Sequence, residues 1–296
     1  MSYPVHETLS PAAVQRAADL IRQADALVIA AGAGMGVDSG LPDVRGQDGF
    51  WRAYPALAKA RIDFHRIASP SAFHASPGLA WGFYGHRLDL YRRTQPHHGF
   101  ELLRHWGERI PNGLGVFTSN VDGQFQKAGF APSQIHECHG SIHHLQCLQP
   151  CCSAIWPAQD FQPEIDEASC ELVNTAPRCP HCGELARPNV LMFSDWGWIE
   201  DRTADQASRQ EAWLSAVKRP VIIELGAGTA IPSVRHFSQR VIHEFGGRLI
   251  RINPRESDVP SRLDVGLPVG AVAGLDAIAQ KLGPDWKQPP KVWHSR

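Results

Sequence analysis

The stretch from Ala26 to Arg45, which reads ALVIAAGAGMGVDSGLPDVR, decides the fold. Its first six residues, Ala26 to Ala31, are apolar and partly β-branched, which predicts a buried strand of a parallel sheet. Gly32 and Gly34 follow directly, and this arrangement lets the backbone approach a pyrophosphate at the N-terminus of the next helix. The stretch is not a true G-x-G-x-x-G motif, because Val37 stands at the third position. A tight turn without a ligand would give the same pattern.

Three further apolar runs predict strands of the same sheet, and each ends in a turn-rich or polar cluster. The runs are Gly115 to Thr118 before SNVDG, Val221 to Leu225 before GAGTA, and Arg248 to Ile252 before NPRES. A helix is predicted over Pro11 to Gln23, because its apolar residues recur at helical spacing and Ser10 suits the N-cap. Buried strands that run straight into small or polar residues are typical of an open α/β sheet, which binds ligands at the carboxyl ends of its strands.

The composition bounds the class of protein. Among 296 residues, 43% are apolar, which is enough for a substantial core and excludes a mainly disordered chain. The 29 basic residues balance 30 acidic ones, so the net charge of −1 gives no drive toward nucleic acid or anionic membranes. The longest apolar run, Ala26 to Val37, is shorter than the about 20 residues of a membrane span, and the first ten residues lack signal-peptide features. We therefore expect a cytoplasmic protein without strong nucleic-acid binding.

A cluster of cysteines predicts a metal site. The sequence CPHCG, which starts at Cys179 and contains Cys182, has the form of a zinc knuckle whose glycine permits the turn around the metal. Its upstream partners are Cys147 and either Cys151 or Cys152. We favour Cys151, because it closes the shorter loop, and Cys152 remains the alternative. Four thiolates suit a tetrahedral structural zinc ion, whereas a redox pair of Cys179 and Cys182 would leave Cys147 without a role.

We predict an α/β fold, in which a Rossmann-type parallel sheet domain carries an inserted small zinc-binding domain and a helical lobe. The sheet domain takes residues 1–47, 111–140 and 196–296. The helical lobe takes residues 48–110, which carry most of the early aromatic residues at mixed helical spacing. The zinc-binding domain takes residues 141–195, which hold most of the cysteines.

The glycine-rich stretch continues as SGLPD from Ser39 and then Arg45, and this string resembles the signature GAG-x-S-x-x-SG-I-P-DFR of the sirtuin (Sir2) family of NAD-dependent deacylases. Four further blocks resemble that family in the same order. They are TSNVDG from Thr118, HG at His139, GAGT from Gly226, and Ile252-Asn253. Together the blocks span roughly residues 26–275, and five blocks in order are far more specific than any one of them.

The resemblance implies a protein-lysine deacylase (deacetylase) that uses NAD and an acyl-lysine protein and releases nicotinamide and O-acyl-ADP-ribose. It implies that His139 is the general base for the ribose hydroxyls, which suits an imidazole with a pKa of about 6.5. It implies that Asn120 and Asp122 hold the nicotinamide ribose and amide as catalytic residues, and that the zinc is structural. The implied NAD-binding residues are Gly32, Ala33, Gly34, Ser39, Asp43, Arg45, Ser119, Asn120, Asp122, Gly226, Thr229, Asn253 and Gly270 or Ala271.

Three positions depart from the family pattern. Val44 stands where the family has a phenylalanine that covers the reacting ribose carbon, Ser119 replaces a glutamine, and FSD from Phe193 replaces F-G-E. A roomier pocket would admit a larger acyl group, or would let water or another acceptor make the protein an NAD glycohydrolase or an ADP-ribosyltransferase. A weakly catalytic NAD or ADP-ribose sensor is a third alternative. If Phe50 or Trp51 fills the gap, ordinary deacylation survives.

Overall fold

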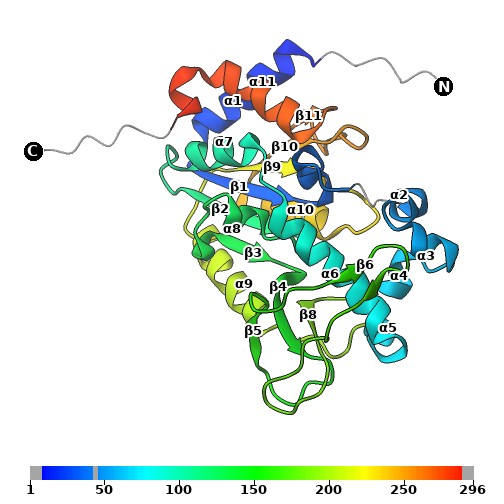
Figure 1. Ribbon diagram of the computed structural model, residues 1–296. Coiled ribbons are helices and arrows are strands. Elements are labelled where there is room, and N and C mark those ends of the chain that lie inside the picture. The colour runs from blue at the N-terminus through cyan, green and yellow to red at the C-terminus, as the bar shows by residue number, and fades with distance from the viewer. Residues whose placement is uncertain (1–8, 43–45, 289–296) are drawn as a thin grey trace, which may run out of the picture.

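The computed structural model describes residues 9–42 and 46–288, and its largest unit is a six-stranded parallel sheet (Figure 1). The strand order is β11-β10-β9-β1-β2-β3. The strands are β1 (Ala26–Ala31), β2 (Leu114–Thr118), β3 (Ile135–Glu137), β9 (Pro220–Leu225), β10 (Arg248–Ile252) and β11 (Val265–Leu267). The four predicted strands are confirmed, with ends within one residue. β3 and β11 are additional, because three residues are too few to show a pattern of apolar positions.

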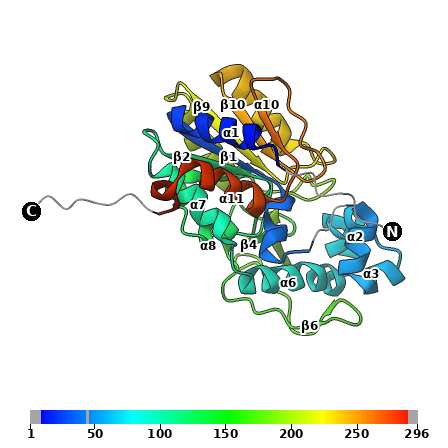
Figure 2. The ribbon, with the colours of Figure 1, turned by 90° about the horizontal axis from the view of Figure 1, so that it is seen from above.

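Helices cover both faces of this sheet, which is why its strands are apolar on both sides. The covering helices are α1 (Pro11–Gln23), α7 (His98–Gly107) and α11 (Ala271–Leu282) on one face, and α9 (Asp201–Leu214) and α10 (Ser233–Phe245) on the other. Alternate residues of β1 enter the two cores, so that Leu27 and Ile29 face α1 and Val28 faces α10. Figure 2 shows α1, α7 and α11 side by side over the sheet. The predicted start of α1 is confirmed, with Ser10 as its N-cap.

A second unit joins helices and antiparallel strands around one apolar core. Its helices are α2 (Gly46–Ala53), α3 (Pro55–Lys59), α4 (Phe64–Ile67), α5 (Pro70–Ala75) and α6 (Pro77–Arg93). Its strands are β4 (Gly140–Cys147), β5 (Ile155–Pro157) and β8 (Ala186–Val190) in one antiparallel sheet, and β6 (Ile165–Asp166) with β7 (Glu171–Leu172) in another. Phe50 and Phe83 of the helices pack in the same core as Ile142 and Val190 of the strands. We call this unit the module.

The packing ends the helical lobe earlier than the sequence predicts. We predict a lobe up to residue 110, but α7 joins the core of the sheet through Phe100, Leu103 and Trp106. The Trp106 indole also donates a hydrogen bond to the Trp286 carbonyl at 3.0 Å, close to the end of the described chain. Aromatic content alone does not show which of two cores a helix joins, so the sequence places α7 wrongly.

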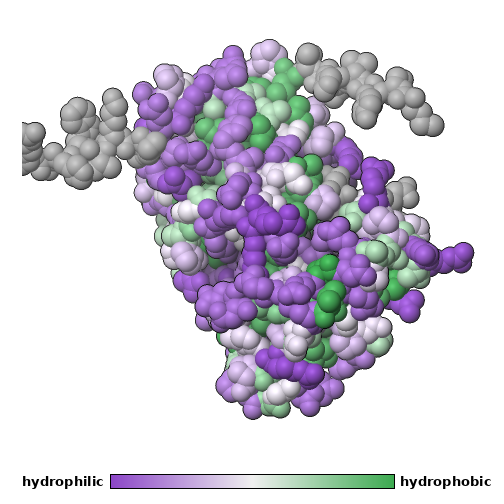
Figure 3. Space-filling view, viewed as in Figure 1, coloured by the Kyte–Doolittle hydropathy of each residue, from purple (hydrophilic) through white to green (hydrophobic). Residues whose placement is uncertain are grey.

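The remaining elements are short. They are α8 (Gln124–Lys127) and the 3₁₀ helices η1 (Ala33–Ser39), η2 (Pro132–Gln134) and η3 (Pro284–Lys287). Within residues 9–42 and 46–288, no helix is both long enough and apolar enough to cross a membrane. Hydrophilic residues cover most of the face seen in Figure 3, with apolar residues scattered among them.

Candidate active site

Four loops meet at one edge of the parallel sheet. The strand register pairs Ala31 of β1 with Thr118 of β2 and Leu225 of β9, and it pairs Leu225 with Ile252 of β10. Four neighbouring strands therefore end at the same level. The loops that follow carry predicted site residues, namely Gly32 to Ser39, Ser119 to Asp122, Gly226 to Thr229, and Asn253. This edge is the one at which α/β sheets bind ligands.

Glycines let the loops after β1 and β9 touch. A Cβ atom on Gly32 would lie 2.8 Å from the Ala227 Cα atom and 2.9 Å from the Gly226 carbonyl oxygen. Gly226 has a φ of +59°, and a Cβ atom there would lie 2.4 Å from the Gly34 Cα atom. The Gly34 N–H donates to the Gly226 carbonyl at 3.0 Å. The two loops thus form one glycine-lined backbone surface, which a diphosphate can approach closely.

The segment after β1 is a 3₁₀ helix, whereas the sequence predicts that an ordinary helix follows the glycines. This helix, η1, has seven residues, and His97 holds it in place. The His97 backbone N–H donates to Ser39 Oγ at 3.0 Å, and its ring Nε2 lies 3.0 Å from the Met35 carbonyl. Burial lowers the pKa of His97, so the ring is neutral at pH 7. The sequence does not single out His97, because the chain has 15 histidines and composition does not show which of them has a structural role.

Polar side chains tie the loops to one another. The Asn120 Nδ2 atom donates to the Gly32 carbonyl at 3.0 Å. The Asn253 Nδ2 atom donates to the Ala227 carbonyl at 2.9 Å, and its Oδ1 accepts from the Glu256 N–H at 3.0 Å. Asn120 therefore joins the loops after β1 and β2, and the buried Asn253 braces those after β9 and β10.

The residues predicted for the adenosine half of NAD include Thr229, in the loop before α10, and Gly270 or Ala271, at the start of α11. Thr229 is exposed, and its Oγ1 lies 3.5 Å from the Glu256 carboxylate. Asp38 of η1 accepts a hydrogen bond from the Val272 N–H at 2.8 Å. This bond holds η1 against the first turn of α11, where Gly270 and Ala271 lie. Asp43, Val44 and Arg45 lie outside the described residues.

His139 lies directly before β4, at the junction of the sheet and the module. Its Nε2 atom is 3.0 Å from the Oγ atom of Ser233, the first residue of α10. Burial lowers the pKa of His139, and a hydrogen bond to the Ser119 backbone carbonyl opposes that shift. Because a carbonyl only accepts, we assign the proton of the neutral ring to the nitrogen facing Ser119, which leaves Nε2 to accept from Ser233. A neutral imidazole whose Nε2 atom accepts a hydrogen bond and bears no proton of its own has the form of a general base.

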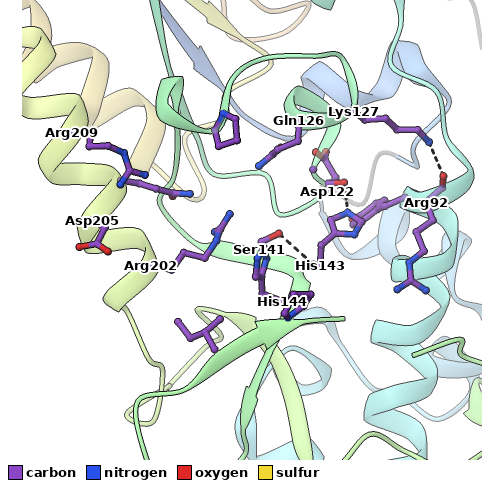
Figure 4. A pocket seen from close by; sticks show the side chains of 16 residues that line it. Arg92, Asp122, Gln126, Lys127, Ser141, His143, His144, Arg202, Asp205 and Arg209 are labelled. Carbon is purple, nitrogen blue, oxygen red and sulfur yellow. Dashed lines mark hydrogen bonds between the residues drawn. The ribbon is translucent and has the colours of Figure 1, made fainter. Parts of the chain in front are cut away.

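Asp122 is a buried carboxyl group in the loop before α8. Its Oδ1 accepts from the Gln124 N–H at 2.9 Å, and burial raises its pKa to about 6. It adjoins a cavity of about 900 Å³, where the His143 Nε2 atom lies 2.9 Å from the Asp122 carbonyl (Figure 4). Apart from Asp122, the lining contains none of the predicted catalytic or NAD-binding residues. This cavity is therefore not the predicted NAD site.

Arg87 of α6 is a partly buried cation that sequence reasoning did not single out. Its Nε and Nη2 atoms donate to the Tyr91 hydroxyl at 2.9 and 2.7 Å, and the guanidinium lies 5.3 to 5.9 Å from the ring centroids of Phe83, Tyr84 and Tyr91. No carboxylate among the described residues forms an ion pair with it. Arg87 does lower the pKa of Asp122, so its charge acts on the candidate site. An arginine inside an aromatic-rich helical segment is the signal that could have found it.

The FSD segment, the third departure from the family pattern, is fixed by a buried ion pair. Asp195 lies 2.7 Å from Arg187 of β8, and both side chains are fully buried. The neighbouring Trp196 is fully exposed. Asp195 also accepts hydrogen bonds from the backbone of Met192 and Gly197 at 3.2 and 3.1 Å. The carboxylate is therefore used to hold this loop rather than to face solvent.

Four cysteines come together at the end of β4. They are Cys147, Cys151, Cys179 and Cys182, whose Sγ atoms all lie within 4.8 Å of one another. The Sγ atoms of Cys147 and Cys182 are 3.6 Å apart, and those of Cys151 and Cys179 are 3.7 Å apart. A tetrahedral zinc ion with Zn–S bonds of about 2.3 Å places its sulfur atoms about 3.8 Å apart, so the set fits that ion. Cys152 is not among the four, although its Sγ lies 3.8 Å from that of Cys151.

The fold and the site define a class of protein: a Rossmann-type α/β protein with a half-buried histidine at the strand ends and a four-thiolate module. The Sir2 family model matches residues 32–211. The NAD-dependent protein deacylase of Aquifex aeolicus is 30% identical over 262 residues, covering 87% of this chain and 97% of that protein. The protein of the same name from Pyrococcus furiosus is 29% identical over 252 residues, covering 85% and 90%.

Solved structures agree with the sequence relatives. A complex of a Sir2 homologue with NAD has a TM-score of 0.66 at 22% identity and covers 95% of this chain and 96% of that one. A mutant Sir2 homologue in complex with ADP-ribose has a TM-score of 0.66 at 24% identity, covering 90% and 95%. This chain belongs to the Sir2 family, so the resemblance found in its sequence is confirmed.

Proposed function

We propose that this protein is an NAD-dependent protein deacylase whose second substrate is an acyl-lysine in a protein or peptide. Curated relatives that match nearly their whole length carry that name. The observation that carries the proposal is the position of His139, whose Nε2 atom lies 3.0 Å from Ser233 Oγ where the loop after β2 meets α10. We assign this nitrogen as unprotonated. That position supplies a general base beside the predicted NAD-binding loops.

The overall reaction transfers the acyl group from lysine to the ADP-ribosyl part of NAD, with loss of nicotinamide. In this proposal the glycine loops after β1 and β9 bind the diphosphate, and Asn120 and Asp122 orient the nicotinamide ribose and amide. His139 Nε2 accepts the proton of a ribose hydroxyl, which activates that oxygen toward the transferred acyl group. Water completes the release of free lysine, and the products are nicotinamide, lysine and O-acyl-ADP-ribose.

The thiolates of the cysteine cluster would hold one structural zinc ion. Four sulfur ligands leave no open coordination position, so the metal supplies no catalytic chemistry. It would join the end of β4 to the turn around Cys179 and Cys182, which stand close to β8 in the chain. The cytoplasmic location and the lack of nucleic-acid and membrane partners stay predictions.

The test is nicotinamide release from NAD, followed by mass spectrometry with and without a panel of acyl-lysine peptides. Release that requires one peptide, together with O-acyl-ADP-ribose, would establish the deacylase and its acyl preference. Release without peptide would point instead to an NAD glycohydrolase or an ADP-ribosyltransferase. Protein that binds NAD but releases no nicotinamide under either condition would be a sensor, and the proposal would be wrong.

We further propose that the acyl group carries a terminal carboxylate. Arg87 is the supporting observation, because it is a partly buried guanidinium with aromatic neighbours and no ion-pair partner among the described residues. Removing a cation from water is costly unless an anion pairs with it. A carboxylate on the acyl chain would supply that anion, and the Tyr91 hydroxyl would hold the guanidinium toward it.

Arg87→Lys and Arg87→Met separate charge from shape in this proposal. We expect Arg87→Met to lower kcat/KM for a dicarboxylic acyl-lysine peptide by 10-fold or more, on the order of one charged hydrogen bond, and to spare acetyl-lysine. Arg87→Lys should keep part of that preference. Equal losses on both peptides would show that Arg87 serves only the packing of α6.

A further inference from the structure

Ser233 provides the side-chain hydrogen bond to the candidate base. We propose that Ser233 is a positioning residue for His139. The Ser233 hydroxyl holds the Nε2 atom of His139 in the unprotonated form and fixes the orientation of the imidazole ring. The two side chains come from segments 94 residues apart, with 3.0 Å between Oγ and Nε2. The catalytic consequence rests on the proposed deacylase function, whereas the interaction itself can be tested in the free protein.

The backbone that carries Ser233 is held rigidly by the sheet. Ser233 opens α10, a helix of 13 residues. The next turn is anchored by Val234 and Phe237, both buried in the core under the sheet, and the Phe237 ring stacks on Phe117 of β2 at a centroid distance of 4.0 Å. The position of the hydroxyl is therefore set by core packing rather than by a loose loop.

Among the described residues, the Ser233 hydroxyl is the side-chain hydrogen-bond partner of the His139 ring, and the Ser119 carbonyl is its backbone partner. The pKa of His139 responds to burial and to the Ser119 carbonyl, and no charged side chain of the described residues contributes to it. The Leu191 N–H donates to the backbone carbonyl of His139 and not to its ring. The neighbouring Cys138 is a neutral thiol, because burial raises its pKa to about 12. On α10, Arg235 is directed to the Ala227 carbonyl and to Glu256.

Two effects of α10 both favour the neutral form of the His139 imidazole. A hydroxyl that donates to Nε2 stabilises the neutral imidazole and has to be displaced or turned before the ring can be protonated. The N-terminus of a helix also carries a partial positive charge, which disfavours an imidazolium ion beside it. Removing only the hydroxyl should therefore raise the pKa of His139, by roughly 0.4 to 1 unit if one hydrogen bond is lost.

NMR titration of the His139 imidazole tests the interaction without any substrate. The variants are Ser233→Ala, which removes the hydroxyl, and Ser233→Thr, which keeps it. Ser238→Ala is the matched control, because Ser238 lies on the same helix, fully buried, with no hydrogen-bond partner for its Oγ among the described residues. His139→Asn identifies the resonance. We expect a higher pKa in Ser233→Ala alone. An unchanged pKa in Ser233→Ala, or equal shifts in the Ala and Thr variants, would overturn the proposal.

The pH dependence of kcat/KM tests the catalytic consequence. In Ser233→Ala the acidic limb should move to higher pH by the shift that NMR measures, and Ser233→Thr should restore it. A shift by NMR without a shift of the acidic limb would refute the role of Ser233 in positioning the base. If the wild-type protein shows no NAD-dependent deacylation, the proposed function fails, and the NMR result still decides whether Ser233 controls the imidazole.

Discussion

The two units that flank the candidate site are stabilised by different means. The sheet lies between two apolar cores, and the larger one collects residues from Val14 to Leu282, which lie close to the two ends of the described chain. The module has strands of two to eight residues and one core, and its thiolate cluster includes the exposed Cys151 and Cys182. Apolar burial dominates in the first unit, whereas the second brings together four thiolates that could hold a metal where its core does not reach. The candidate active site lies where these two units meet.

The largest effect should come from the junction of the two units and should leave both of them folded. We expect His139→Ala to lower turnover by about 10²- to 10⁴-fold, the usual contribution of a general base. NAD affinity and the melting temperature should change little, because His139 contributes no large apolar area to either core. Nicotinamide release and calorimetric NAD titration check this. His98→Ala is the control, because His98 is exposed and pairs with Asp276. Unchanged turnover in His139→Ala would remove it as the base.

The metal should matter to the module and not to the sheet. We expect Cys182→Ser, or removal of zinc by a chelator, to lower the melting temperature together with deacylase activity, because the loss of one ligand opens the cluster. NAD binding should be weakened less, since the sheet carries most of the predicted contacts. Cys152→Ser is the matched control, because it lies beside the cluster and outside it. Full activity in protein verified to be free of metal would contradict a structural role for zinc.

A smaller effect should come from the contact between the loops after β1 and β9. Gly226→Ala would place a Cβ atom 2.4 Å from the Gly34 backbone at a φ of +59°, so we expect a loss of about 1–3 kcal/mol in stability and weaker NAD binding. Gly246→Ala is the control, because Gly246 has a φ of +66° and open space around it. Denaturant unfolding and NAD titration of both variants distinguish two causes. One is the backbone strain of a positive φ, which both variants share, and the other is the collision with the Gly34 backbone, which only Gly226→Ala has. Equal behaviour of the two variants would show that the loops do not need to touch.

An effect on stability of similar size concerns the buried carboxyl group of Asp122, and it depends on pH. Burial raises its pKa from 3.8 to about 6, so the folded state holds this proton more tightly than the unfolded chain. The stability that the group contributes is complete below about pH 3.8 and is lost as the pH rises through 6. Asp122→Asn should therefore be more stable than wild type by about 1–3 kcal/mol at pH 7.5, and equally stable at pH 4. If the difference in stability between Asp122→Asn and wild type were the same at pH 7.5 and pH 4, ionisation of Asp122 would be excluded as its cause. Turnover should fall at either pH.

Much of the site could be predicted because its signals are local. A strand followed by glycine or small polar residues shows in a few consecutive positions, and so does a C-x-x-C knuckle. Such spacings predict β1, β2, β9 and β10, and with the family resemblance they predict which loops gather at the sheet edge. They do not show β3 or β11, nor the 3₁₀ form of η1, because segments this short take their structure from what they pack against.

The sequence by itself determined the family, the parallel sheet and the set of chemical groups at the site, since each depends on the order and spacing of neighbouring residues. The tertiary structure alone decided which groups touch. It selected Cys151 over Cys152 for the cluster, placed α7 on the sheet, and brought Ser233 to His139. Contacts between residues tens of positions apart depend on how the two cores fill space, and no local pattern carries that information.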